Sequence, residues 1–171
     1  MQKLSDSLDI GETIDAAVFD FSKAFDVVPS NKLRTKMLNL GIEHVLVNWI
    51  LSYLTDRTQQ VSLGNCLSES ADVTSGIIQG STLGPTLFNI YINDLPIKLN
   101  SSSNFYADDF IMHKVIQTDL DRALFQIDLD LAHKWSIDWG IQFNYDKCNV
   151  ITFTKKRKGR VSLGVDLAIL G

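Results

Sequence analysis

Two adjacent aspartates, Asp108 and Asp109, stand between two short apolar segments, residues 104–107 and 110–115. Each flanking segment has the length and composition of a strand, so the sequence predicts a hairpin with two acids at its tip. Adjacent carboxylates repel each other, and a partly buried charge needs a partner. A divalent cation would neutralise the pair, whereas a solvated Asp-Asp turn is the simpler alternative for an isolated pair.

A third aspartate, Asp20, ends another apolar segment, residues 13–19, which is typical of a buried strand. Two strands that end in carboxylates and lie side by side would form an oxygen-rich site suited to Mg²⁺. Two such ions could activate an attacking hydroxyl and stabilise the leaving oxygen of a phosphoryl transfer. Asp26 is a weaker candidate, because it can equally cap or hydrogen-bond the following turn.

A glycine-rich segment, residues 76–85, forms the next candidate element. Its glycines allow the backbone to approach a ligand closely, and Gln79 offers both a hydrogen-bond donor and an acceptor. By itself, this segment is equally well explained as an ordinary loop that leads into a helix.

The remaining pattern predicts an α+β fold for the whole chain. Helices are expected at 30–40, 42–53, 84–93 and 118–139, and further strands at 59–63, 69–75, 143–154 and 161–163. The longest helix is expected to bury a stripe of Leu120, Leu124, Ile127, Leu131 and Trp135. Trp49, Trp135 and Trp139 fall on helical stripes and are predicted to be core residues.

Composition limits the classes of function that the chain can have. Of 171 residues 45% are hydrophobic, enough for a folded core, and the net charge is −4. Phosphate neutralisation supplies most of the affinity of nucleic-acid binders, so this charge argues against strong independent binding of nucleic acid but not against a catalytic core. Cys66 and Cys148 have no metal-ligand spacing and predict reduced thiols of an intracellular protein, nuclear or cytoplasmic. Neither a secretory signal nor a membrane-spanning stretch is expected.

Four segments, taken in order, resemble a known family. Residues 19–26 (Phe-Asp-Phe-Ser-Lys-Ala-Phe-Asp), 79–85 (Gln-Gly-Ser-Thr-Leu-Gly-Pro) and 106–109 (Tyr-Ala-Asp-Asp) resemble reverse-transcriptase motifs A, B and C. Residues 144–147 resemble motif D. Over nearly its whole length the chain is similar to reverse transcriptases of non-long-terminal-repeat (LINE-type) retrotransposons, including jockey-like elements.

This resemblance implies a fold and a domain organisation. The expected fold is a polymerase palm, in which an antiparallel sheet with an RRM- or ferredoxin-like core packs on helices. Residues 1–171 would form a partial reverse-transcriptase domain, the palm with part of the fingers, carrying motifs A to D. No segment upstream of Asp20 matches the basic residues of the family's fingers, and a thumb is incomplete, so the resemblance implies a truncated polymerase core.

The resemblance also implies catalytic roles for four residues. Asp20 matches the metal ligand of motif A. Asp108 and Asp109 match the paired ligands of motif C, of which Asp108 would be the firmer. Lys147 matches the motif D lysine, which could give a proton to the departing pyrophosphate, although a lysine at the start of a strand can also be merely solvated.

Four further residues would contact the substrates. Phe25 matches the bulky residue beside the incoming sugar, whose ring would clash with a ribose 2′-hydroxyl and favour deoxynucleotides. Gln79 and Gly80 match the loop that contacts the incoming nucleotide and the template. Phe21 is also expected to bind the substrate.

The implied reaction is DNA synthesis directed by RNA. Its cofactors would be two Mg²⁺ ions, with Mn²⁺ as an alternative, and its partners an RNA template, a DNA primer and deoxynucleoside triphosphates. The resemblance does not set an oligomeric state, and no membrane partner is expected.

Other functions remain open at this point. One is a related palm polymerase, such as an intron-encoded or telomerase-like reverse transcriptase or an RNA-dependent RNA polymerase, although the ring of Phe25 argues against ribonucleotide use. Another is a non-catalytic remnant that serves as an interaction or RNA-binding module. A gene fragment without a function of its own is the third.

Overall fold

A computed structural model of the chain describes residue 7, residues 9–106 and residues 109–154. The chain divides into two compact units. Unit 1 consists of residues 1–22 and 94–171, and unit 2 consists of residues 23–93.

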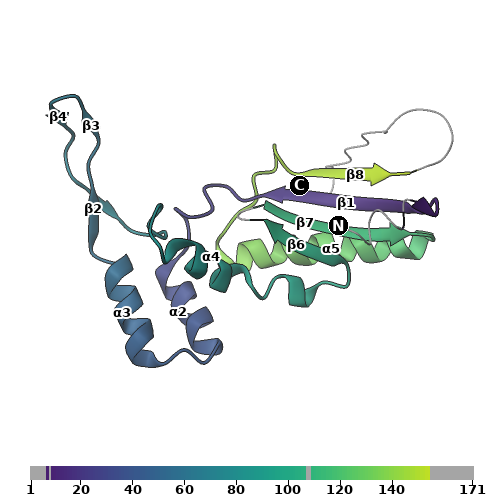
Figure 1. Ribbon diagram of the computed structural model, residues 1–171, viewed down its shortest axis with the longest axis horizontal. Helices are drawn as coiled ribbons and strands as arrows, with labels where there is room; N and C mark the ends of the chain where they lie inside the picture. The colour runs from purple at the N-terminus through teal and green to yellow at the C-terminus, as the bar shows by residue number, and fades with distance from the viewer. Residues whose placement is uncertain (1–6, 8, 107–108, 155–171) are drawn as a thin grey trace. The chain divides into compact units, whose positions relative to one another are not determined.

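Unit 1 is built on a four-stranded antiparallel sheet (Figure 1). Its strands are β1 (Thr13–Asp20), β6 (Ser102–Tyr106), β7 (Asp109–Ile116) and β8 (Asn149–Phe153). They lie in the order β6-β7-β1-β8, so the two strands that carry the predicted acids, β1 and β7, are adjacent in the middle of the sheet. The sequence thus predicted correctly that these two segments are strands.

One long helix, α5 (Asp119–Trp139), runs along a face of this sheet (Figure 1). The helix begins with a capping box in which Thr118 and Asp121 bond each other's backbone amides, and it ends at Gly140 in the left-handed conformation. Phe125, Ala132 and Trp135 point into the core of the unit. A short 3-10 helix, η1 (Pro96–Lys98), precedes β6.

The predicted buried stripe of α5 is wrong for part of its length. Leu120 and Ile127 are 66% and 49% exposed. Two polar residues, Asp128 and Ser136, are instead fully buried. They interrupt the apolar periodicity on the inner face of the helix, so a pattern of hydrophobic residues alone selected the neighbouring face.

Asp128 is buried because it binds the turn that leads into β6. One carboxylate oxygen accepts bonds from the backbone amide and the side-chain amide of Asn100, at 3.0 and 3.2 Å. The other accepts bonds from the backbone amide and the hydroxyl of Ser101, at 2.8 and 2.5 Å. Burial alone would raise the pKa of this carboxyl, but these hydrogen bonds favour its charged form and lower the pKa below its ordinary value.

Unit 2 contains three helices and a long hairpin. The helices are α2 (Ser30–Asn39), α3 (His44–Leu54) and α4 (Gly84–Ile92), and α2 contacts both of the others. Their shared core includes Leu33, Met37, Val47 and Tyr91, all with no exposed surface. Gly84 and Pro85 open α4 as the sequence predicts, because proline is well suited to the first helical turn.

The hairpin is formed by two pairs of short strands. The pair β2 (Arg57–Gln59) and β5 (Ala71–Val73) lies at its base, and the pair β3 (Ser62–Leu63) and β4 (Cys66–Leu67) flanks the turn. Figure 1 shows it extending away from the helices of its own unit. The sequence predicted this hairpin and its turn at Gly64.

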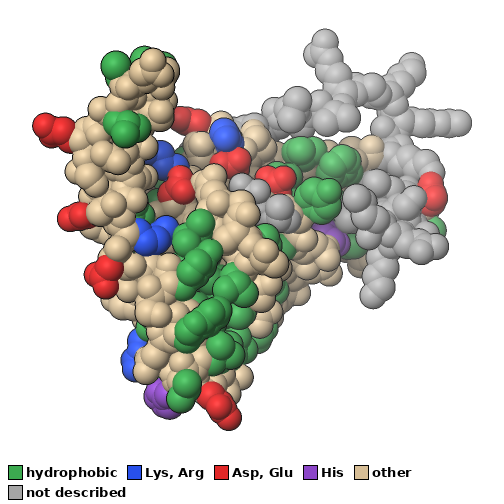
Figure 2. Space-filling view, turned by 60° about the vertical axis from the view of Figure 1, so that its left-hand side comes forward, with side chains coloured by type: hydrophobic (Ala, Val, Ile, Leu, Met, Phe, Trp, Pro, Cys, Tyr) green, Lys and Arg blue, Asp and Glu red, His purple; other side chains and the backbone are tan. Residues whose placement is uncertain are grey.

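The prediction that Trp49 is a core residue is wrong. Trp49 is 58% exposed and lies on an outward face of α3 with Val45, Leu46 and Tyr53. Figure 2 shows hydrophobic side chains gathered on the surface of this unit. The polar residues of α3, His44, Asn48 and Ser52, mark one narrow face, and all the other positions are apolar. The apolar surface is therefore wider than the buried stripe of Val47, Ile50 and Leu54, and its periodicity could not indicate which part of it is buried. Trp135, by contrast, is buried as predicted.

Three smaller predictions can also be compared with the structure. The strand expected at 143–154 is shorter, because only β8 pairs with β1. The strand expected at 161–163 lies outside the described residues. Cys66 and Cys148 are free thiols, as expected.

The helices in the described part of the chain were compared with the requirements of a membrane-spanning helix. None of these described helices has both the length and the apolar character that a crossing of the bilayer needs.

Candidate active site

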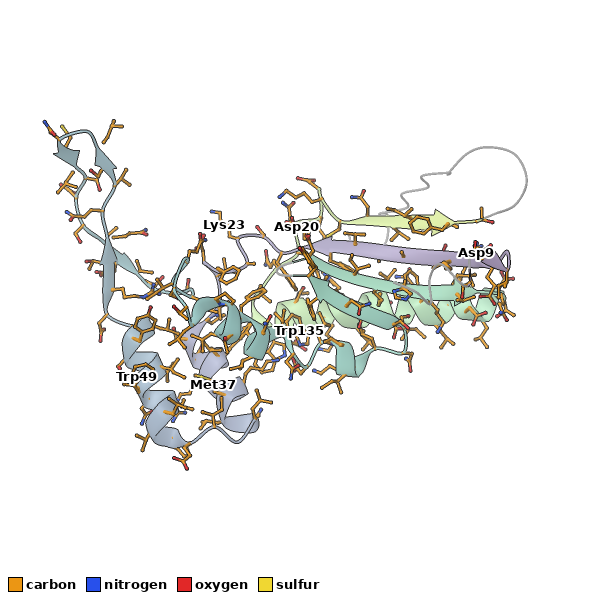
Figure 3. All side chains as sticks on the ribbon, in the orientation of Figure 1. Asp9, Asp20, Lys23, Met37, Trp49 and Trp135 are labelled. Carbon is orange, nitrogen blue, oxygen red and sulfur yellow. The ribbon has the colours of Figure 1, made fainter. Side chains whose placement is uncertain are left out.

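Two of the predicted acids meet at one end of the sheet in unit 1. Asp20 is the last residue of β1 and Asp109 is the first residue of β7, and the two are direct partners across the strands. Residues directly opposite each other in an antiparallel pair project from the same face and lie close together. Figure 3 shows Asp20 at the end of its strand. The fold therefore brings two carboxylates together from positions far apart in sequence.

The neighbouring pair in the register determines which face the acids occupy. Phe19 and Phe110 are 3% and 0% exposed, and their ring centroids are 5.4 Å apart. Successive side chains of a strand project to opposite faces, so Asp20 and Asp109 lie on the face opposite these rings. The aromatic pair fixes the strand ends, while the side chain of Asp20 keeps 28% of its surface exposed and Asp109 is exposed.

The carboxylates present fit a hard divalent cation, because Mg²⁺ prefers oxygen ligands. Among the described residues no group of three or more His, Cys, Asp or Glu side chains is placed to hold a metal ion. The third predicted ligand, Asp108, lies outside the described residues. The two described acids thus supply part of the predicted ligand set, and the role of Asp108 stays a prediction.

Lys147 is the cation closest to this carboxylate end among the described residues. Its Nζ lies 3.3 Å from Oδ2 of Asp20. The turn before β8 places it there, since the amide of Lys147 donates to the carbonyl of Asn144, whose own amide donates to the carbonyl of Asp20. The resemblance implied that Lys147 gives a proton to the departing pyrophosphate. The structure brings its side chain to Asp20, and the catalytic role stays a prediction.

Phe21 occupies a different environment. Its ring is 3% exposed and stacks on Phe143, with centroids 4.8 Å apart. The ring of Trp135 lies on another side of it, at 6.4 Å. The side chain therefore belongs to the core of unit 1, and the expected contact with a substrate stays a prediction.

The other predicted substrate contacts lie in unit 2. Phe25 is half-buried and stacks on Phe88 of α4, with ring centroids 4.7 Å apart and planes 22° apart. Gln79 is exposed, and its Nε2 donates to Oδ1 of Asp26 at 2.8 Å. Gly80 follows with a φ of 75°, a left-handed conformation that glycine adopts without strain.

Backbone hydrogen bonds fasten the glycine-rich loop to the segment that carries Phe25. The amide of Gly76 donates to the carbonyl of Val28, and the amide of Ile77 donates to the carbonyl of Phe25, at 2.9 and 2.7 Å. The hydroxyl of Ser75 donates to the carbonyl of Asp26 at 2.9 Å. Two segments about fifty residues apart in sequence therefore form one continuous substructure.

A protein family matches most of the chain, including both of these regions. The family described as reverse transcriptase (RNA-dependent DNA polymerase) matches residues 9–167. The chain belongs to the reverse transcriptase family. The match spans both the carboxylate end of unit 1 and the glycine-rich loop of unit 2.

Curated relatives of this reverse transcriptase domain come from mobile elements. The chain is 28% identical over 151 residues to the RNA-directed DNA polymerase from mobile element jockey of Drosophila melanogaster, covering 82% of this chain and 16% of that protein. It is 29% identical to the jockey polymerase of Drosophila funebris, covering 87% and 17%. A probable RNA-directed DNA polymerase from transposon X-element of Drosophila melanogaster is 28% identical, with 92% and 18% covered. The chain thus spans about a sixth of the length of these relatives.

A solved structure supports the fold of the reverse transcriptase domain. Telomerase from Candida tropicalis, in complex with the TWJ fragment of telomeric RNA, superposes with a TM-score of 0.60 at 13% identity. The superposition covers 96% of this chain and 33% of that chain. At this identity the likeness concerns the fold, a mixed helical and antiparallel-sheet domain.

A hollow of about 870 Å³ lies beside the loop of the reverse transcriptase domain, within unit 2. Its polar lining combines both charges and includes Lys23, Asp26, Arg57, Gln59, Asp72 and Gln79. Arg57 could not be identified from the sequence, because a single arginine between a helix and a strand has no spacing that distinguishes it from a solvated residue. In the structure its side chain donates to three backbone carbonyls of unit 2.

Proposed function

We propose that this chain is the palm core of an RNA-directed DNA polymerase of a non-long-terminal-repeat retrotransposon. The reaction would join a deoxynucleoside triphosphate to a primer on an RNA template. The observation that carries the proposal is the direct cross-strand pairing of Asp20 with Asp109, at the start of the strand that follows Asp108.

The sheet supports the palm assignment. Its strand order, β6-β7-β1-β8, together with the chain order β1, β6, β7, α5, β8, fits a ferredoxin-like core. The fingers and thumb would belong to other parts of a longer polypeptide, consistent with the sixth of each jockey relative that this chain covers.

Asp20, Asp108 and Asp109 would hold two divalent cations, Mg²⁺ or Mn²⁺. When bound, such ions activate an attacking hydroxyl and stabilise a leaving oxygen. The aspartates themselves orient the ions, and the buried Phe19–Phe110 pair keeps the two strand ends in register. Preorganised charge of this kind supplies most of the rate in phosphoryl transfer.

The primer 3′-hydroxyl would attack the α-phosphate, and pyrophosphate would leave as the new phosphodiester bond forms. Lys147 would give its Nζ proton to that leaving group, and its place beside the carboxylate of Asp20 supports this role. The ring of Phe25 would exclude a ribose 2′-hydroxyl, and Gln79 with Gly80 would contact the nucleotide and template. Oriented binding of this kind accounts for much of the remaining rate.

A primer-extension assay tests the proposal. The chain, and a longer polypeptide that contains it, are given an RNA template, a DNA primer and deoxynucleoside triphosphates with Mg²⁺ or Mn²⁺. We expect metal-dependent incorporation that falls by about 10²- to 10³-fold in Asp20→Asn and Asp108→Asn, the scale seen when one group that stabilises transition-state charge is lost. Asp130→Asn, an exposed carboxylate on α5, serves as the control.

Two results would contradict the proposal. One is an absence of incorporation by the longer polypeptide, and the other is undiminished incorporation by the Asp20→Asn variant. Incorporation by the longer polypeptide alone would mean that this chain needs its flanking segments for activity.

A further inference from the structure

Arg57 connects three elements of unit 2 through one side chain. Its Nε donates to the carbonyl of Leu54, the last residue of α3, at 2.7 Å. Its Nη2 donates to the carbonyls of Ser75 and Gly76, at 3.3 and 2.8 Å. Figure 1 shows α3 leading directly into β2, the strand that Arg57 begins. A guanidinium can bind both sites because its donors have a fixed planar geometry.

The carbonyls that Arg57 binds belong to the residues that fasten the glycine-rich loop. Ser75 and Gly76 donate in turn to the carbonyls of Asp26 and Val28, and the next residue, Ile77, donates to the carbonyl of Phe25. One continuous series of hydrogen bonds therefore runs from the end of α3, through Arg57 and the loop, to the segment that carries Phe25.

The glycine-rich loop packs tightly against the segment at 25–28 where Gly76 meets Asp26. Gly76 has a φ of 92°, and a Cβ at this position would lie 2.6 Å from the carbonyl oxygen of Asp26. Backbone packs directly on backbone, so a shift of the loop is transmitted to the segment at 25–28. Beyond it, Gln79 bonds Asp26 from the same loop, and Phe25 is stacked on Phe88.

We propose that Arg57 is a positioning residue that sets the placement of Phe25 and Gln79 and thereby the selectivity for deoxynucleotides. It acts through the backbone of Ser75 and Gly76, without contact to the nucleotide. The selectivity part of this inference rests on the proposed polymerase function, whereas the structural part concerns the loop alone.

The structural part can be tested on this chain by hydrogen exchange. In Arg57→Gln and Arg57→Lys we expect the amides of Gly76 and Ile77 to exchange about tenfold faster, since one lost bond of about 1.4 kcal/mol corresponds to a factor of ten. Lysine keeps the charge but cannot reproduce the planar fork, so it should not restore protection. Amides of β1 and β7 in unit 1 serve as the internal reference for folding.

Arg34→Gln is the matched control. Arg34 is exposed on α2 of the same unit, and among the described residues its side chain has no hydrogen bond or ion pair. This change removes the same charge without touching the loop, so the exchange of Gly76 and Ile77 should stay as in the unmodified chain. Unchanged exchange in both Arg57 variants would overturn the inference.

The selectivity part is tested in the polypeptide that incorporates nucleotides. We expect Arg57→Gln to lower the preference for deoxynucleoside over ribonucleoside triphosphates by about tenfold, with a raised KM for the deoxynucleotide and a smaller change in kcat. A purely structural role would reduce the active fraction, and so kcat, without altering that preference. An unaltered preference would therefore overturn the inference.

Failure of the two proposals can be told apart. If the unmodified polypeptide incorporates nothing, the proposed function fails, and hydrogen exchange still decides whether Arg57 holds the loop. If it incorporates deoxynucleotides and the Arg57 variants retain both protection and preference, only the present inference fails.

Discussion

In unit 1 the candidate catalytic side chains stand at the ends of strands and are sparsely bonded, whereas in unit 2 they are held by a dense set of backbone contacts. Asp109 is exposed, and within the described part of the chain Asp20 forms an ion pair with Lys147 alone. Phe25 and Gln79 belong to segments joined by several hydrogen bonds. Carboxylates that are to receive cations must keep free oxygen atoms, while a surface that selects a sugar must keep its shape.

In unit 1 the densest side-chain hydrogen bonding surrounds Asp128, away from Asp20 and Asp109, and the largest stability change should follow from removing this residue. Asp128→Ala leaves the buried amide and hydroxyl of Ser101 without their acceptor, whereas the donors of the exposed Asn100 can turn to water. We expect a loss of roughly 4 kcal/mol in the free energy of unfolding, since each unsatisfied buried group costs about 1–3 kcal/mol. Urea unfolding measures it, with Asp130→Ala as the exposed control; equal losses in both would contradict the account.

The same residue gives a dependence on pH. The pKa of Asp128 is lowered in the folded chain, so its contribution is complete above about pH 4, the unfolded value, and is lost as the pH falls through the folded value. The difference in unfolding free energy between the unmodified chain and Asp128→Ala should therefore shrink below pH 4. A difference that grew on acidification would show that the carboxyl is bound in its neutral form.

In unit 2 the free energy of unfolding should be most sensitive to substitution where Gly76 of the glycine-rich loop meets the backbone of Asp26. In Gly76→Ala the added methyl group would meet the backbone of Asp26 in a left-handed conformation, and we expect a loss of about 2–3 kcal/mol. Gly64→Ala is the control, because Gly64 also has positive φ but nothing within 4 Å of the added carbon. Urea unfolding should show the smaller loss, about 1 kcal/mol, for Gly64. A reversed order would mean that the loop is not packed as described.

The smallest effect is expected on the outer face of α3. Trp49→Ser removes a side chain that is 58% exposed, so the free energy of unfolding should change by less than about 0.5 kcal/mol. The matched change in the core, Trp135→Ser, should cost about 3 kcal/mol or more, since Trp135 is 2% exposed and donates to Asp94. Comparable losses for both substitutions, measured by urea unfolding, would contradict the burial of one and the exposure of the other.

Much of unit 1 could be predicted from the sequence because its signals are local. Apolar segments that end in Asp20 or flank Asp109 indicate strands directly, and Thr118 with Gly140 marks both ends of α5. The pairing of β1 with β7 could be inferred only because a shared site needed it. Nothing local revealed that Asp128 faces inward, since its burial depends on a turn distant in sequence.

The same limit explains Arg57 and Trp49. The partners of Arg57 are carbonyls, which every residue possesses, so no pattern of side chains can point to them. The exposure of Trp49 was not predictable because the apolar surface of α3 is wider than the stripe that the other helices cover. Motifs indicated the residues that would touch substrates, but not the residues that hold those motifs in place.

We propose that Asp20 and Asp109 share a site for divalent cations at one end of the sheet. Paramagnetic broadening of backbone amide resonances by small amounts of Mn²⁺ tests it most directly, because it detects even weak binding and needs no catalysis. We expect broadening centred on residues 19–21 and 108–110 that Mg²⁺ reverses and that Asp20→Asn abolishes. Broadening centred elsewhere, or unchanged in Asp20→Asn, would contradict the account.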